Sequence, residues 1–206
     1  MTHDHHAIHD DIAFMRSLAE EGRQAPMIGG PILLAIGLIF GAANGLGLAM
    51  TLSGAANGPG LILLPGGALA LFLVVLGVLK RRQAAAGGTI SAANRAAGAL
   101  WRAIGMSSGL LFALMAVAAW RLGDWKVMAA SPVLLFILYG AGWQVAATVG
   151  RQGWLKAVSL GSYLCAAAIA LLASAPLASA AVSTAGLLLL MALPGYRLMR
   201  QARAAA

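Results

Sequence analysis

The stretch PILLAIGLIFGAANGLGLAM, residues 31–50, is 20 residues long and contains no Asp, Glu, His, Lys or Arg. A helix rises about 1.5 Å per residue, so a helix of this length matches the hydrocarbon core of a bilayer, about 30 Å thick. The stretch lacks the alternation of polar and apolar residues that the strands of a membrane barrel show. A helix satisfies all its backbone hydrogen bonds in lipid. The stretch therefore predicts a transmembrane helix.

Five further apolar runs of similar length follow this one. They cover residues 60–79, 103–120, 127–149, 155–173 and 177–196. The chain of 206 residues is 61% hydrophobic and 10% charged, with a mean hydropathy of +0.85. Soluble domains contain about 25% charged residues. We therefore expect an all-α polytopic membrane protein, in which residues 27–197 form one bundle of six transmembrane helices. Residues 1–26 and 198–206 are its tails, and the connections are too short for a soluble domain.

Basic residues predict how the bundle is oriented. If the N-terminus is cytoplasmic, twelve of the 14 Lys and Arg residues lie in cytoplasmic segments. They are Arg16, Arg23, Lys80, Arg81, Arg82, Arg95, Arg102, Arg151, Lys156, Arg197, Arg200 and Arg203. Only Arg121 and Lys126 then lie outside, so the positive-inside rule places both termini in the cytoplasm. The net charge of +8 is explained by orientation and attraction to anionic lipid, and we expect no nucleic-acid partner.

The spans lack the residues that most intramembrane chemistry needs. Ionisable side chains inside a membrane usually mark proton relays, ion paths or cofactor ligands, and these spans contain none in their deep parts. The single cysteine, Cys165, has no partner for a disulfide. No H-E-x-x-H run is present either. We therefore expect no cofactor, no catalytic residue and no enzymatic activity.

Two spans carry glycines at helical spacing. Gly37, Gly41 and Gly45 are four residues apart, and Gly105 and Gly109 repeat the spacing in the third span. Such residues form a flat stripe on which a neighbouring helix can pack closely. The neighbour is either another helix of the same chain or a second copy, so a homo-oligomer stays open.

Polar residues occur at similar depths in the third, fourth and fifth spans, near their cytoplasmic ends. They are Ser107, Ser108, Gln144, Ser162 and Tyr163, with Tyr139 and Trp143 close to them in the sequence. One interpretation is hydrogen bonding between helices. The other is a small pocket open to the cytoplasm, because ligand sites combine an apolar lining with a few convergent polar groups.

The N-terminal tail holds all four histidines and five of the six acidic residues. Within it, residues 11–22 place Ile12, Met15, Leu18 and Ala19 on one face, which predicts a short amphipathic helix at the membrane interface. His5 and His9 are four residues apart, so on a helix they could share a zinc or nickel ion.

Two functions remain compatible with the sequence. One is a non-enzymatic scaffold or regulator that contacts a soluble or membrane protein partner through its cytoplasmic face. The other is a small transporter or channel for an uncharged or apolar solute, using the polar pocket. The preference for Arg over Lys, 11 against 3, and the abundance of Ala and Gly suggest a GC-rich bacterial gene, and hence the bacterial inner membrane.

Overall fold

The computed structural model describes residues 29–55, 60–85 and 92–204, and every regular element in these residues is helical. The elements are α2 (Gly30–Leu52), α3 (Gly60–Ala85), α4 (Ala92–Leu122), the 3-10 helix η1 (Trp125–Ala130), α5 (Ser131–Val149), α6 (Trp154–Leu171), α7 (Pro176–Leu187), the π-helical turn η2 (Leu188–Ala192) and α8 (Leu193–Ala204). The N-terminal tail, with the expected interfacial helix and with His5 and His9, lies outside the described residues.

Six helical rods are long and apolar enough to cross a membrane, so the predicted all-helical bundle of six such helices is confirmed. They are α2, α3, α4, η1 with α5, α6, and the continuous rod of α7, η2 and α8. Three helices extend clearly beyond the predicted spans: α3 ends at Ala85 rather than near residue 79, the last rod ends at Ala204 rather than near residue 196, and α4 begins at Ala92 rather than near residue 103. The start of α4 agrees with the stretch SAANRAAGALWRAIG, residues 91–105, in which Ser91 predicts the start of a helix that runs on into the third span. Hydropathy marks only the part of a helix that suits lipid, whereas a helix continues while its backbone hydrogen bonds can form.

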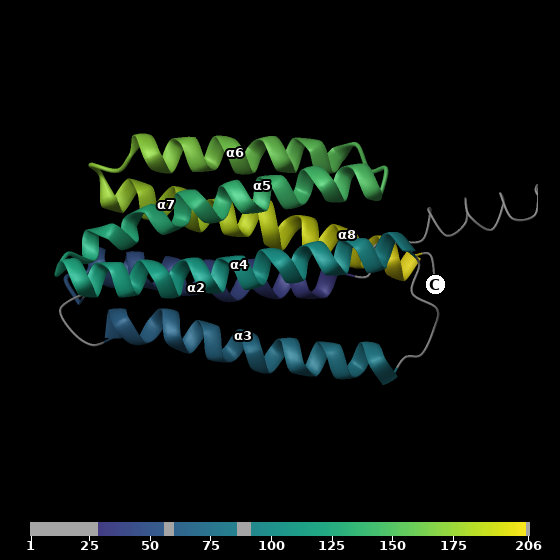
Figure 1. The fold of residues 1–206 in the computed structure, drawn as a ribbon, viewed down its shortest axis with the longest axis horizontal. Helices are drawn as coiled ribbons and strands as arrows, with labels where there is room; N and C mark the ends of the chain where they lie inside the picture. Colours follow the sequence, from purple (N-terminus) through teal and green to yellow (C-terminus); the bar gives the residue numbers. More distant parts are fainter. Residues whose placement is uncertain (1–28, 56–59, 86–91, 205–206) are drawn as a thin grey trace, which may run out of the picture.

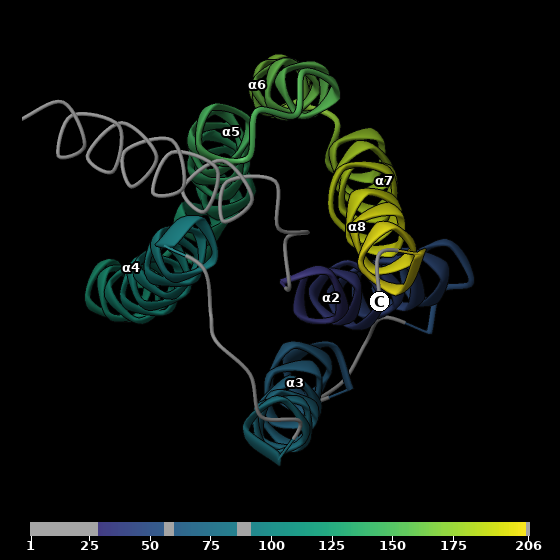
Figure 2. The same ribbon diagram turned by 90° about the vertical axis from the view of Figure 1, so that its right-hand side faces the viewer.

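The rods lie roughly side by side in an open arc (Figures 1 and 2). Along the arc, the order is α3, α2, the last rod, α6, α5 and α4, and the most extensive contact is between α5 and α6. Helix α3 packs mainly on α2, and α4 packs mainly on α5 and η1. The two helices at the ends of the arc are therefore consecutive in the sequence.

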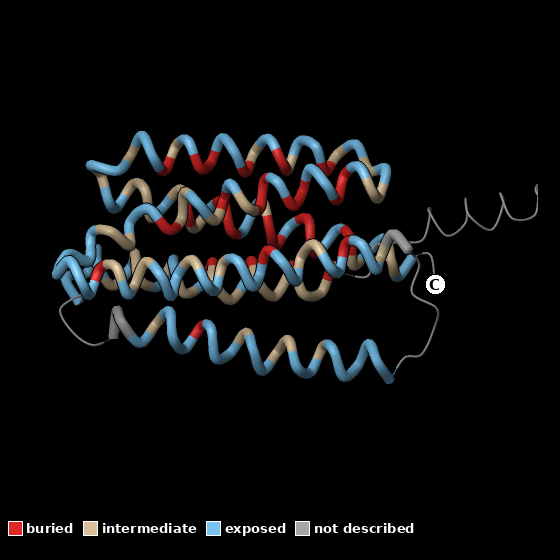
Figure 3. Tube along the Cα trace, viewed as in Figure 1, coloured by how far each residue is buried: buried red, intermediate tan, exposed pale blue. Residues whose placement is uncertain are grey.

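The core lies between α5, α6 and the last rod, with α2 against it. Its largest fully buried side chains include Phe136, Trp143, Leu155, Ile169 and Met191. In contrast, Leu63 of α3 is 68% exposed and Met106 of α4 is 72% exposed. Figure 3 shows this difference as buried positions gathered on the α5–α8 side. Because these helices are apolar all round, their exposed faces are suited to lipid.

The last rod contains a π turn for a local reason. Pro194 has no backbone N–H, and its ring would clash with the carbonyl group four residues earlier in a regular helix. Directly before it, the N–H of Leu193 donates to the carbonyl oxygen of Leu188, five residues back. The wider turn accommodates the proline without ending the helix.

Candidate functional site

The interface between α5 and α6 holds the strongest polar contact between two rods. The buried Ser159 Oγ donates to the main-chain oxygen of Gly140 at 2.7 Å. The ring of Tyr163 also covers Gly140, since a Cβ added there would lie 2.7 Å from Tyr163 Cε1. The absence of a side chain at Gly140 therefore lets α6 approach α5 closely.

Three of the seven predicted pocket residues are buried in the packed core. Ser162 Oγ donates to the Val158 oxygen of its own helix at 2.9 Å. The fully buried Trp143 meets Trp101 of α4 edge to face, with ring centroids 4.9 Å apart. Tyr139 packs in the same way on Phe136, at 5.9 Å. The rings of Trp143 and Tyr139 thus fill space in the core. The Ser162 hydroxyl forms its hydrogen bond within its own helix.

The other four predicted residues are less buried. Ser107 and Gln144 are exposed. Tyr163 is 39% exposed, and its ring lies over Gly140 at the α5–α6 interface. Ser108 is half-buried, and its Oγ has no hydrogen-bond partner among the described residues. The seven residues thus occupy buried, half-buried and exposed positions.

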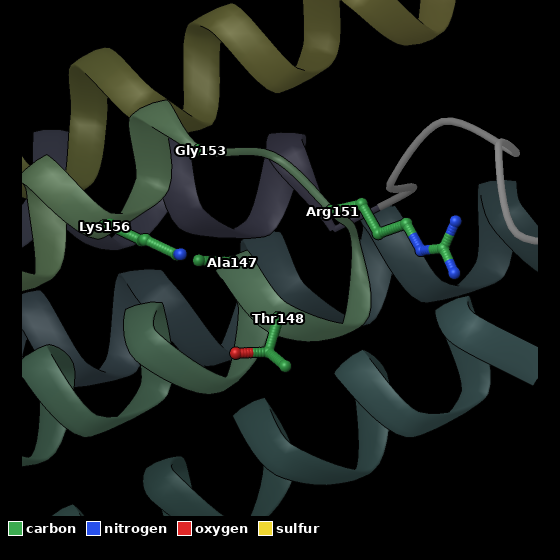
Figure 4. Close-up of a pocket in the computed structure, with 5 residues that line it drawn as sticks. All are labelled: Ala147, Thr148, Arg151, Gly153 and Lys156. Atoms are coloured by element: carbon green, nitrogen blue, oxygen red, sulfur yellow. The ribbon is translucent and has the colours of Figure 1, made fainter.

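None of the seven residues lines either of two hollows on the surface of the described helices. One is an apolar groove of about 530 Å³ between α2 and α3. It is lined by Leu38, Ile39, Ala42, Ala43, Leu46, Leu63, Leu64, Gly67, Ala68 and Leu71. The other, of about 270 Å³, lies where α5 turns into α6, and we call it the turn pocket (Figure 4). It is lined by Ala147, Thr148, Arg151, Gly153 and Lys156.

The backbone of the turn pocket is fixed by the way α5 ends. The N–H of Gln152 donates to Ala147 O at 3.2 Å, and that of Arg151 donates to Thr148 O at 3.4 Å. This pair of bonds is the Schellman ending of a helix, which needs a left-handed residue and usually has glycine there. Here the residue is Arg151, with a φ of 50°. The position of the arginine in a glycine-preferring site is a feature that sequence reasoning missed.

Two contacts hold the beginning of α6 in place. Trp154 Nε1 donates to Gln152 Oε1 at 3.0 Å. The guanidinium of Arg197 in α8 lies over the face of the Trp154 ring, with the Arg197 Cζ 5.9 Å from the ring centroid. Lys156 follows in the first turn of α6, exposed to the pocket side.

The turn pocket lies at the end of the bundle that we call the basic end. This is the end where α3 and α8 finish, where α4 begins and where α5 meets α6 (Figure 1). Its basic residues are Lys80, Arg81, Arg82, Arg95, Arg102, Arg151, Lys156, Arg197, Arg200 and Arg203. Asp124, the one acidic residue in the described ranges, lies in the turn before η1 at the opposite end.

The predicted glycine stripe of the first span faces the last rod. A Cβ added at Gly37 would overlap the backbone of Ala192, and one at Gly41 would lie 2.9 Å from Leu188 Cδ2. At Gly45 the nearest atom, Thr184 Cγ2, is 3.4 Å away. At Gly105 and Gly109 an added Cβ would meet no described atom within 4 Å, so no described helix of the same chain packs closely on them, and contact with a second copy stays a prediction. These two glycines lie on an exposed face of α4, because α5 packs on another face of that helix.

Other glycines make equally close contacts that sequence reasoning did not single out. Gly30 lies against the backbone of Met199 and Gly195, so α2 and α8 touch main chain to main chain. Gly142 receives the side chain of Ile104, and Gly186 faces Cys165 and Phe136. The chain contains 26 glycines, and their spacing alone does not distinguish these positions from exposed ones.

The described helices contain no cluster of three or more His, Cys, Asp or Glu residues that could hold a metal ion. The buried Cys165 is close to the carbonyl oxygen of Val182, with its Sγ at 3.7 Å.

Taken together, six apolar rods of membrane length define a multi-pass helical membrane protein whose outer faces contact the lipid bilayer. Comparisons of the chain with protein families, with curated proteins and with solved structures found no match.

Proposed function

We propose that this chain is a non-enzymatic scaffold or regulator of the bacterial inner membrane that acts through its cytoplasmic face. Its termini are cytoplasmic, and its partner is a soluble or membrane protein. The observation that carries the proposal is the separation of charge along the bundle. Ten basic residues lie at the basic end, and the described residues place no acidic side chain among them. Such a surface attracts acidic protein surfaces and anionic lipid over several ångströms.

The packing of α5 and α6 supports this function over transport. A carrier using the third to fifth spans needs a polar path past Gln144 and Tyr163. The Gln144 side chain is exposed, and the Tyr163 ring packs over Gly140, whereas the space between the helices is filled by side chains such as Trp143 and Phe136. The buried Ser159 and Ser162 hydroxyls are already used in hydrogen bonds to the backbone.

Site-specific photo-crosslinking in living cells tests the scaffold function. A photoreactive amino acid is placed at Gln83 or Gln201, both exposed at the basic end, and at Trp125 at the other end as the matched control. We expect a protein adduct of one defined mass from Gln83 and Gln201 and none from Trp125. Changing Arg81 and Arg82 to Glu should abolish the adduct from Gln83. Equal adducts from all three positions would contradict an interaction confined to the basic end.

A second measurement tests the transport alternative directly. The purified protein is placed in liposomes, and swelling is followed with glycerol and urea as uncharged solutes. We expect rates equal to those of liposomes without protein. Faster swelling in liposomes that contain the protein, if Gln144→Leu abolishes it, would contradict the scaffold function and support a channel.

A further inference from the structure

We propose that the turn pocket binds the phosphate group of an anionic phospholipid. This inference goes beyond the scaffold function and does not depend on it. The pocket has a volume of about 270 Å³ and has two cationic residues, Arg151 and Lys156, in its lining. A third cation lies near the start of α6, since Arg197 of α8 lies over the ring of Trp154. The five lining residues therefore include two cationic side chains and no acidic one.

The side chains offer a phosphate both charge and hydrogen-bond donors. In Figure 4, Lys156 extends across the hollow toward Ala147, whereas Arg151 extends from the turn away from Lys156. One cation thus lies in the hollow and the other at its edge. Basic pockets between transmembrane helices, at the level of the headgroups, are typical binding sites for anionic lipid headgroups.

Both cationic residues occupy positions that local structure disfavours. Arg151 has a φ of 50°, a left-handed conformation in which a side chain is strained and glycine is preferred. Lys156 is the third residue of α6, where the positive end of the helix dipole repels a cation. Departures from local preference gather at functional sites. The positive-inside rule explains why basic residues are numerous at this end, but it does not explain why they occupy these two positions. A bound phosphate would offset the repulsion at Lys156.

The surroundings of the pocket favour a lipid as the source of the phosphate. The pocket lies where two membrane-length helices meet, beyond Val149 of α5 and at the beginning of α6. Gln144 lies one turn deeper than Thr148, about 6 Å along α5. Its side chain is exposed, so its amide group can donate to the ester groups of a glycerolipid. Deeper still, Leu160 is 59% exposed and Leu164 62% exposed, which suits acyl chains.

Native mass spectrometry of the full-length protein in detergent tests this site. Phosphatidylglycerol and phosphatidylcholine with the same acyl chains are titrated, and the lipid-bound fraction is measured. The variants are Lys156→Gln, Arg151→Gly and the double variant. Lys80→Gln is the matched control, because it removes one charge at the same end but outside the pocket. A basic residue near anionic lipid contributes enough binding energy for about a five-fold change in affinity.

We expect phosphatidylglycerol to bind more tightly than phosphatidylcholine. Each pocket variant should weaken its binding about five-fold, and the double variant about 25-fold. Lys80→Gln should change the affinity less than two-fold. Glycine suits the left-handed conformation at position 151, and the melting temperature of every variant is measured in parallel, so that a loss of lipid binding is separated from unfolding.

Three results would overturn the proposal. In the first, Lys80→Gln weakens binding as much as Lys156→Gln, which would mean diffuse attraction to the whole basic end. In the second, Lys156→Gln binds phosphatidylglycerol as the unchanged protein does, at an unchanged melting temperature. In the third, millimolar inorganic phosphate displaces the lipid, which would make the pocket a site for a free anion.

Discussion

Gly37 of α2 faces Ala192 of the π turn so closely that a Cβ added to Gly37 would lie 2.7 Å from both the Cα and the Cβ of Ala192. The contact loosens along the stripe, through Gly41 to Gly45, where the nearest atom is 3.4 Å away. In lipid, helices associate without a hydrophobic driving force, so close packing of small residues carries much of the association. The two rods are therefore held together most tightly in the half of the membrane near Gly37.

The first prediction concerns this gradient. Gly37→Ala should lower the free energy of unfolding by about 1–3 kcal/mol, because the new methyl group meets backbone atoms that cannot move aside. Gly45→Ala should change it by less than about 0.5 kcal/mol, the usual range for changes away from tight packing. Thermal unfolding in detergent, followed by tryptophan fluorescence, measures both. Gly105→Ala is the control and should be neutral or stabilising by up to about 1 kcal/mol. Equal effects at Gly37 and Gly105 would contradict the assignment of the packing face.

The second prediction separates two buried serines. Ser159→Ala removes a hydrogen bond between two rods and should destabilise the protein by about 0.6 kcal/mol, the average for such bonds in membranes. Ser162→Ala removes only a bond within α6, so its effect should be smaller. Unfolding in mixed micelles of increasing sodium dodecyl sulfate gives both free energies. A larger loss at Ser162 would mean that the two hydroxyls have the opposite roles.

The third prediction concerns the attachment of α4. A Cβ added at Gly142 would lie 2.5 Å from Ile104 Cδ1 and 3.3 Å from Trp101 Cη2. Gly142→Val should therefore push α4 away from α5 and disturb the edge-to-face pair of Trp101 and Trp143. We expect a loss of near-ultraviolet circular dichroism while the far-ultraviolet helical signal is retained. Gly98→Val, at a position with no described atom within 4 Å of an added Cβ, should leave the near-ultraviolet signal unchanged.

The fourth prediction is topological. In a Cys165→Ala background, a cysteine replacing Lys126 should react with a membrane-impermeant maleimide in intact spheroplasts, because this exposed residue lies in the predicted outside segment. A cysteine replacing Lys80 or Arg200 should react only after the membrane is permeabilised. Labelling in the reverse order would show that the basic end faces outward.

The six spans could be predicted because membrane crossing depends on the length and polarity of one continuous segment. The stretch at 31–50 contains that information by itself, and α2 extends only from Gly30 to Leu52. The start of α4 does not follow from hydropathy, although the stretch at 91–105 predicts a helix that runs on into the third span. Its first turns contain Arg95 and Arg102, which lower the hydropathy but do not interrupt the helix.

The candidate site was harder to predict, because depth along a span does not give the direction in which a side chain points. Tyr139 and Gln144 belong to the same helix, yet one is buried in the core and the other is exposed. In a helix that is apolar all round, the hydrophobic pattern does not show which face meets a neighbour. For the same reason, Gly37 and Gly105 belong to similar stripes and have opposite surroundings.

The order of the helices along the arc affects how the chain is made. Helix α2 is synthesised first among the described spans, and most of its contacts are with the last rod. At about 5–20 residues per second, a ribosome needs roughly 7 to 28 seconds to extend the chain from the end of α2 to Ala192. During that interval α2 has only α3 to pack against, and the face that contains Gly37 meets lipid. The core of the bundle therefore closes after translation of the last span, and a chain that stops before Pro176 leaves its first helix without its main partner.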